Sequence, residues 1–205
     1  MDIKTIVFDF GGVLIDWNPR YFYKDIFNDD QRMEWFLREV CNDGWNAELD
    51  RGMTFAQGIE ELKKRQPEEL HPLIEVYHQG WEKMLGGPLD GTVSILERLK
   101  AGGRYKLYGL TNWSAETFPI AMERYPFLKL FDGIVVSGEE RLIKPDPAIF
   151  RLLIERYGFD PGHSVYIDDN LKNVEAADRQ GFNAVHFTSP QALEKELDGL
   201  GVGLG

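Results

Sequence analysis

The segment from Pro88 onward alternates short apolar runs with longer amphipathic stretches. Short apolar runs bounded by turn residues are typical of buried strands, and apolar residues spaced by three and four are typical of helices. We therefore expect strands at residues 106–110, 133–136, 164–167 and 184–187, with helices between them. This alternation predicts a parallel sheet covered by helices on both faces.

Another strand is expected at residues 6–8, but the chain after Leu14 has helical periodicity for about 70 residues. Several amphipathic helices with short connections are typical of a small helical bundle. The first strand is thus separated from the rest of its sheet. We expect an α/β protein with a three-layer core made of residues 1–15 and 90–205, and with residues 16–89 inserted as an α-helical cap.

Capping residues and periodicity indicate where several helices begin and end. In the cap, helices are expected from Tyr21 to Phe27 and from Leu70 to Met84. In the core, Ser114 is expected to cap the helix that follows the second strand. Asp146 is expected to start a strong helix that ends at Gly158.

Polar residues follow the expected strands at the points where they end. Asp9 follows the first strand, Thr111-Asn112 the second, Lys144 lies in the loop after the third, and Asp168-Asp169 follows the fourth. In open parallel sheets, ligands bind outside the carboxyl ends of the strands. Each motif alone could be a cap or a turn, but four motifs at one edge of the sheet indicate a functional site.

The acidic residues among them suggest phosphoryl transfer. Asp9, Asp168 and Asp169 would repel one another, and their pKa values would rise, unless a cation lay between them. Mg²⁺ prefers oxygen ligands and fits such a site. Asp9 would then attack phosphorus to give an aspartyl phosphate, while Lys144 would neutralise charge on the transferring group.

The phosphate itself needs donors. Thr111 and Asn112 are expected at the N-terminus of a helix, where hydroxyl, amide and backbone N–H groups bind phosphate oxygens. Lys144 is followed by Pro145-Asp146-Pro147, which holds the chain rigidly around it. We therefore expect Lys144 to serve the site rather than to be a solvated surface lysine.

Four motifs in this order resemble those of the haloacid dehalogenase superfamily of hydrolases. They are Asp9-Phe10-Gly11-Gly12-Val13-Leu14, Leu110-Thr111-Asn112, Lys144-Pro145-Asp146-Pro147-Ala148-Ile149-Phe150 and Ile167-Asp168-Asp169-Asn170. The resemblance covers nearly the whole chain. It implies a Rossmann-like core with a helical cap inserted just after the first motif.

The resemblance also implies roles for these residues. Asp9 would be the nucleophile and a magnesium ligand. The backbone carbonyl of Gly11 and the carboxylate of Asp169 would be further ligands, and Asp168 would reach the metal through water. The phosphate would be held by Thr111, Asn112 and Lys144.

The first motif departs from the usual phosphatase pattern. Phosphatases of this superfamily mostly have a second aspartate two residues after the nucleophile, which protonates the leaving group, and here that position is Gly11. A good leaving group needs less protonation, so a sugar 1-phosphate or an acyl phosphate fits better than an alkyl phosphate. The chain is also similar to a bacterial subgroup resembling α-D-glucose-1-phosphate phosphatase, which has glycine there too. Asp16 or Glu48 could replace the acid, and Trp113 and Arg51 are candidates to touch the leaving group.

The predicted function is therefore a magnesium-dependent phosphatase that hydrolyses a small phosphorylated metabolite, for example a sugar phosphate. One alternative is a 2-haloacid dehalogenase, which attacks carbon without a metal and resembles this chain except at Asp168-Asp169, where serines stand instead. The other is a non-catalytic metabolite-binding or partner-binding protein, which would explain the missing acid at Gly11. Metal dependence separates the first two, and a broad substrate screen tests the third.

Charge and composition argue against several other classes. The net charge of −11 over 205 residues opposes binding to nucleic acid. Asp9 interrupts the N-terminal apolar run, so neither a signal peptide nor a membrane span is expected, and a cytoplasmic protein is predicted. The single Cys41 excludes an intramolecular disulfide, and the four histidines lack the spacing of a zinc site.

Overall fold

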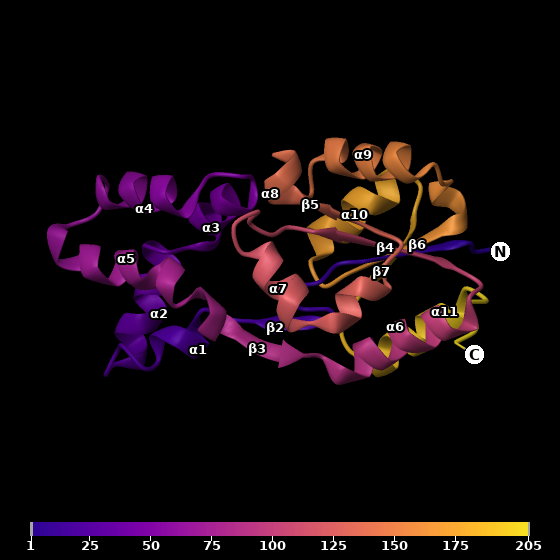
Figure 1. Cartoon of the computed structure of the whole chain (residues 1–205), viewed down its shortest axis with the longest axis horizontal. Coiled ribbons are helices and arrows are strands. Elements are labelled where there is room, and N and C mark those ends of the chain that lie inside the picture. The colour runs from indigo at the N-terminus through magenta and orange to yellow at the C-terminus, as the bar shows by residue number, and fades with distance from the viewer. Residues whose placement is uncertain (1, 205) are drawn as a thin grey trace.

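A computed structural model describes residues 2–204 of the chain, and a five-stranded parallel sheet forms its centre (Figure 1). The strand order is β5-β4-β1-β6-β7. The strands are β1 (Thr5–Phe8), β4 (Lys106–Thr111), β5 (Gly133–Val136), β6 (Ser164–Asp168) and β7 (Asn183–His186). Because β1 pairs with β4 on one side and β6 on the other, the carboxyl end of β1 lies at the middle of the sheet edge.

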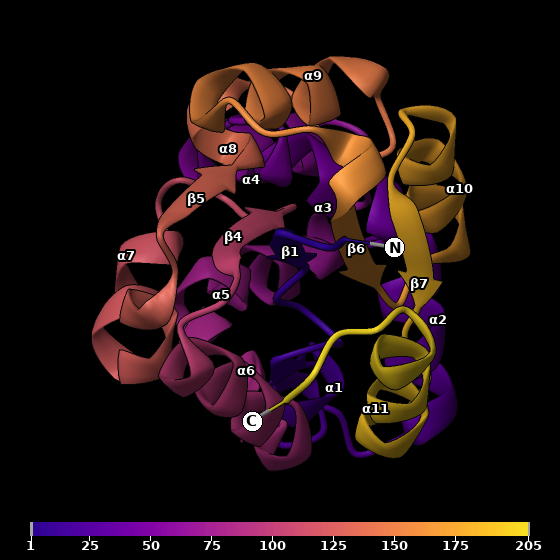
Figure 2. The same cartoon turned by 90° about the vertical axis from the view of Figure 1, so that its right-hand side faces the viewer.

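Helices cover both faces of the sheet (Figure 2). One face carries α9 (Pro147–Tyr157) and α10 (Leu171–Arg179), and the other carries α6 (Asp90–Gly102), α7 (Phe118–Arg124) and α11 (Pro190–Gly199). Val7 of β1 packs with the first group, whereas Ile6 and Phe8 pack with the second. Side chains alternate across a strand, so β1 is buried on both faces and reads as a continuous apolar run. The predicted three-layer α/β core is confirmed.

The helical cap is inserted between β1 and β4, as predicted. The chain leaves the core through β2 (Ile15–Trp17) and returns through β3 (Leu85–Pro88), and these two short strands pair antiparallel. Figure 1 shows the inserted helices grouped at one end of the sheet. They are α1 (Arg20–Tyr23), α2 (Asp30–Glu39), α3 (Asp43–Asp50), α4 (Phe55–Lys63) and α5 (His71–Gln79).

Aromatic side chains hold the cap helices together. The ring of Tyr23 lies 5.2 Å from that of Phe36 and 6.2 Å from that of Tyr77, measured between centroids. All three residues are buried, and the hydroxyl of Tyr23 donates to the carbonyl of Leu73 at 2.8 Å. Such aromatic pairs stabilise the fold beyond what burial alone provides, so the cap helices share a packed aromatic centre.

Some predicted boundaries are correct and others are wrong. Asp146 caps α9 through the N–H of Ala148, and Gly158 ends it at a φ of 65°, both as predicted. The helix expected to end at Phe27 stops at Tyr23, and the one expected to reach Met84 stops at Gln79.

A tight contact explains the early end of α5. Gly80 lies against the ring of Phe22, and the chain changes there into a 3₁₀ turn at Trp81–Met84. The expectation for Ser114 is also wrong, because its hydroxyl accepts from the N–H of Glu116 within a turn and α7 begins only at Phe118. Two short helices, α3 and α8 (Ser137–Glu140), were not predicted. Among residues 2–204, no helix is long and apolar enough to cross a membrane.

Candidate active site

The carboxyl ends of the central strands open onto a cavity of about 390 Å³ that lies between the sheet edge and the cap. The core side of its wall includes Asp9, Gly11, Asn112, Lys144 and Asp169. The cap side includes Asp43, Asn46, Asp50 and Trp81. Residues far apart in the sequence therefore share one cavity.

Asp9 is positioned by the end of β1. Its N–H donates to the carbonyl of Ile167 at 2.9 Å, and its carboxylate accepts from the N–H of Phe10 at 2.6 Å. Gly12 then turns the chain with a φ of 73°, and a Cβ atom at Gly12 would collide with the carboxylate of Asp169. Only glycine combines this conformation with so close an approach, which explains the glycine at position 12.

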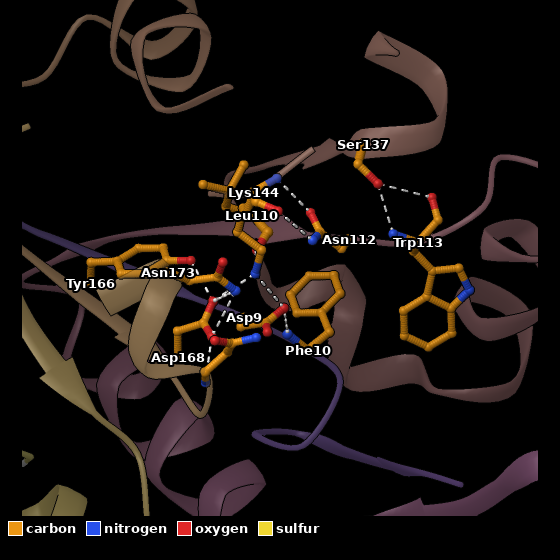
Figure 3. Close-up of polar contacts among 11 residues, drawn as sticks. Asp9, Phe10, Leu110, Asn112, Trp113, Ser137, Lys144, Tyr166, Asp168 and Asn173 are labelled. Atoms are coloured by element: carbon orange, nitrogen blue, oxygen red, sulfur yellow. Dashed lines mark hydrogen bonds and ion pairs between the residues drawn. The ribbon is translucent and has the colours of Figure 1, made fainter. Parts of the chain in front are cut away.

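Lys144 joins two of the carboxylates (Figure 3). Its ammonium lies 2.9 Å from Oδ1 of Asp9 and 2.7 Å from Oδ2 of Asp168, and it also donates to the carbonyl of Leu110 at 3.0 Å. The side chain is fully buried. All three of its N–H groups have acceptors, so its position is fixed from three directions.

Asn112 holds the backbone of Lys144. Its side-chain oxygen accepts from the N–H of Lys144 at 2.9 Å, and its side-chain nitrogen donates to the carbonyl of Lys144 at 3.1 Å. The helix expected directly after Thr111 and Asn112 does not begin there. Thr111 is fully buried, and its hydroxyl has no hydrogen-bond partner among the described residues.

Asp168 is surrounded by donors. Besides Lys144, its carboxylate accepts from the hydroxyl of Tyr166 at 2.5 Å, from the side chain of Asn173 at 3.1 Å and from the N–H of Asn170 at 2.8 Å. Tyr166 and Asn173 were not predicted as site residues. In the sequence, Tyr166 has the pattern of a core residue of β6, with no sign of a role in the site. The only sequence signal for Asn173 is its nearness to Asp168, five residues earlier in the chain.

Burial and charge shift the pKa values of this cluster in different directions. Burial, and then Asp168, raise the pKa of Asp9 although Lys144 opposes the shift. Burial would lower the pKa of Lys144, but the carboxylates of Asp168 and Asp9 outweigh it, so its pKa is raised. Burial opposes ionisation of Asp168 too, but the ion pair with Lys144 holds the pKa of Asp168 below its usual value. Burial and Asp168 raise the pKa of Asp169.

The charges of the cluster do not cancel. Oxygen atoms of Asp9, Asp168 and Asp169 all lie within 4.8 Å of one another, and one ammonium faces these three carboxylates. A divalent cation would relieve the carboxylate repulsion that, together with the larger effect of burial, raises the pKa of Asp9. The donors are carboxylate oxygens, the ligand type that Mg²⁺ prefers, so the residues fit a magnesium ion.

The charged and amide groups on the cap side of the wall come from one face of α3. Asp43, Asn46 and Asp50 are separated by three and four residues, which places them on the same face of the helix. Sequence reasoning missed them because α3 itself was not predicted.

The suggested substitutes for the missing acid lie elsewhere. Glu48 is exposed and faces Arg51 at 3.9 Å, and neither residue lines the cavity. Asp16 is also outside the cavity wall and accepts from the hydroxyl of Tyr21. Trp113, the other candidate to touch the leaving group, lines the cavity.

Known proteins resemble the chain over most of its length. A sesquiterpene phosphatase of Aspergillus oryzae, astK, is 28% identical over 210 residues, which cover 95% of this chain and 94% of the relative. A phosphorylated carbohydrates phosphatase of Thermotoga maritima is 26% identical, covering 90% of this chain and 84% of the relative.

A solved structure and a family model agree with these relatives. The magnesium complex of the HAD family enzyme bt-2542 from Bacteroides thetaiotaomicron has the same fold, with a TM-score of 0.71 at 22% identity over 92% of this chain and 95% of the other. The model of the haloacid dehalogenase-like hydrolases matches residues 3–181. The chain therefore belongs to the haloacid dehalogenase-like hydrolase family.

Proposed function

We propose that the protein is a magnesium-dependent phosphatase that hydrolyses a small phosphorylated metabolite through an aspartyl phosphate on Asp9. The convergence of Asp9, Asp168 and Asp169 around the buried Lys144 carries this proposal. Two relatives with full-length similarity are named as phosphatases, which supports it.

The proposed roles combine what the family resemblance implies with the contacts of each residue. The carboxylates of Asp9 and Asp169 and the backbone carbonyl of Gly11 would hold Mg²⁺. Asp168 already accepts from Lys144, so we assign it to fix Lys144 and to reach the ion through water. When bound, the ion neutralises negative charge on the cluster and on the phosphate.

Asp9 would attack phosphorus, and Lys144 would stabilise the charge that develops on the transferring group. Thr111, with its free buried hydroxyl, would donate to a phosphate oxygen. Asn112 would act with it and would also keep Lys144 in place through two hydrogen bonds to its backbone.

The leaving group would occupy the cavity below the cap. We propose residues 16–89 as the cap, because β2 and β3 connect it to the core at these positions. The aromatic rings of Trp17, Trp81 and Trp113 in the wall suit an apolar or sugar-like leaving group. Sugar phosphates are therefore our first candidate substrates, and prenyl-type phosphates the second. We place the enzyme in the cytoplasm, where the buried Cys41 would stay reduced.

A panel of phosphate esters assayed with Mg²⁺ and with excess EDTA tests the proposal. We expect release of inorganic phosphate with Mg²⁺ and loss of that release with EDTA. Hydrolysis of 2-chloropropionate that persists in EDTA would instead identify a 2-haloacid dehalogenase. No turnover of any ester, acyl phosphate or haloacid would favour a non-catalytic binding protein.

A further inference from the structure

Cleavage of an alkyl phosphate needs a proton for the departing oxygen. The inference drawn below, about the source of that proton, rests on the proposed phosphatase function. The titratable groups in the cavity wall are Asp9, Asp43, Asp50, Lys144 and Asp169. Lys144 donates all its hydrogens to other groups, and we assign Asp9 and Asp169 to phosphorus and to the metal. Two carboxyl groups remain, and both come from α3 in the cap.

We propose that Asp50 is the general acid that protonates the leaving-group oxygen. The cap would thus supply the group that the core lacks at Gly11. Asp50 ends α3, is partly exposed and lines the cavity in which we place the leaving group.

Two hydrogen bonds orient the Asp50 side chain. Oδ2 of Asp50 accepts from the side-chain nitrogen of Asn46 at 3.0 Å. The side-chain oxygen of Asn46 accepts in turn from the hydroxyl of the buried Tyr77 at 3.0 Å. Because the side-chain oxygen of Asn46 accepts from Tyr77, its side-chain N–H group is left to face Asp50.

The backbone of Asp50 is tied to the core. Its carbonyl accepts from the hydroxyl of Ser137 in α8 at 2.5 Å, and that hydroxyl also accepts from the N–H of Trp113 at 2.9 Å. The turn that follows Asp50 also packs closely against the core, since a Cβ atom on Gly52 would lie only 2.8 Å from the carbonyl oxygen of Gly138. Asp50 is therefore held in place relative to the sheet edge as well as within the cap.

The charge state of Asp50 suits a proton donor. Among residues 2–204, no lysine, arginine or histidine forms an ion pair with it. Burial raises the pKa of Asp50 to about 7, although the N–H of Ser114 and the charge of Lys144 oppose the shift. Besides Lys144, the titratable groups that face it are Tyr77 of α5 and Asp43 of its own helix.

Asp43 lacks these features. It is exposed and lies in the first turn of α3, at the other end of the helix from Asp50. Asp43 is thus less suited than the oriented, half-buried Asp50 to serve as the proton donor.

In the first step of the proposed reaction, an oxygen of Asp9 forms a bond to phosphorus while the bond from phosphorus to the leaving oxygen breaks. The proton of the Asp50 carboxyl group moves to that oxygen, and an alcohol departs. Water then attacks the phosphorus of the aspartyl phosphate and releases inorganic phosphate, and one proton of that water restores the Asp50 carboxyl group.

The leaving group's need for a proton provides the test. First-turnover rates are measured by rapid quenching for p-nitrophenyl phosphate, whose leaving group departs unaided, and for glycerol 2-phosphate, whose alkoxide needs a proton. Asp50→Asn should lower the glycerol 2-phosphate rate about 10²- to 10⁴-fold and the p-nitrophenyl phosphate rate less than about threefold. The fall in the wild-type glycerol 2-phosphate rate above pH 7 should disappear in this variant.

Glu48→Gln is the matched control, because it removes one carboxylate from the same helix outside the cavity. We expect wild-type rates for both esters. Asp50→Asn rates that fall equally for both esters, or for neither, would overturn the inference, as would a selective loss in Asp43→Asn instead. A wild-type enzyme that hydrolyses neither ester would refute the proposed function itself, and this inference with it.

Discussion

The two walls of the cavity hold their polar groups in different ways. On the core side, Lys144, Asp9 and Asp168 bind one another at 2.7 to 2.9 Å inside a buried cluster. On the cap side, Asp50 has the side chain of Asn46 as its neutral partner and is partly exposed to the cavity. In the core cluster one buried ammonium joins two carboxylates, whereas Asp50 in the cap has no cation as a partner.

This difference separates two tasks. A buried, ion-paired cluster keeps its geometry whatever substrate enters, which suits the transfer of a phosphoryl group. A cap carboxyl group on a short helix can be changed without disturbing that cluster, which suits selection and protonation of the leaving group. We therefore expect core substitutions to abolish all turnover and cap substitutions to act on some substrates only.

Replacing the nucleophile should have the largest effect. Asp9→Asn should lower phosphatase activity at least about 10⁴-fold for every ester, because the amide cannot form the aspartyl phosphate. The fold should survive, since asparagine has the same shape and can still accept from the N–H of Phe10. Steady-state rates and circular dichroism measure the two effects. Substantial activity in this variant would remove Asp9 from the mechanism.

Removing the central cation should come next. Lys144→Ala should lower kcat about 10²- to 10³-fold, as expected for a lost preorganised charge. It should also lower the free energy of unfolding by about 3 to 5 kcal/mol, because it leaves Asp168 buried without its partner. Denaturant titration with EDTA measures the stability change.

The exposed Lys64 provides the control for this variant. Lys64 pairs with Glu61 on the cap surface at 2.9 Å. Lys64→Ala should change stability by less than about 0.5 kcal/mol and leave kcat unchanged. Equal effects of the two lysine variants would contradict the central place of Lys144.

The same contrast between core and cap decides how much could be predicted from sequence. Asp9, Lys144 and Asp168 follow parallel strands, and the carboxyl ends of parallel strands meet at one edge, so strand order alone brings these residues together. The strands themselves are recognisable because they are buried on both faces. For these reasons the three-layer core and the meeting of its polar residues were predictable.

The cap side was not predictable for a physical reason. Which residues of α3 face the cavity depends on where the helix begins, and a one-residue change of start rotates its face by about 100°. Sequence reasoning singled out Arg51 and Glu48, which flank Asp50 on other faces of this helix end. The hydrogen bond from Asn112 to the backbone of Lys144 could not be predicted either, because the sequence does not show which way the Asn112 side chain turns.

Magnesium should stabilise the folded chain if the core cluster binds it. At a concentration of 100 times Kd, Mg²⁺ should raise the free energy of unfolding by about 2.7 kcal/mol. Asp169→Asn should remove most of that gain, because it deletes a ligand and one negative charge from the cluster. Thermal unfolding with and without Mg²⁺ tests this independently of activity. A melting temperature that does not respond to Mg²⁺ in the wild type would contradict the metal site.

The uncompensated cap carboxyl group should cost stability at alkaline pH. The pKa of Asp50 is about 7 in the folded chain and near 3.8 when unfolded, so between these values the folded form binds more protons. The free energy of unfolding should therefore fall as pH rises from about 4 to 7. At pH 8, Asp50→Asn should be more stable than the wild type by more than about 1 kcal/mol, since one pKa unit corresponds to about 1.4 kcal/mol. If the free energy of unfolding changed with pH in the same way in the wild type and in Asp50→Asn, the raised pKa of Asp50 would be refuted.

The smallest effects test whether cap and core unfold together. Thr54 caps α4 in the cap, and Ser189 caps α11 in the core, each through its hydroxyl group. Replacing either by alanine should cost about 1 kcal/mol and lower the melting temperature by about 2 to 4 °C. One hydrophobic cluster runs from Tyr77 in the cap to Leu96 and Leu197 in the core, so both variants should shift the same single transition. A second unfolding transition that shifts only in Thr54→Ala would mean that the cap unfolds separately from the core. The position of Asp50 would then depend on the hydrogen bond from the Ser137 hydroxyl to its carbonyl, and not on the hydrophobic packing shared by cap and core.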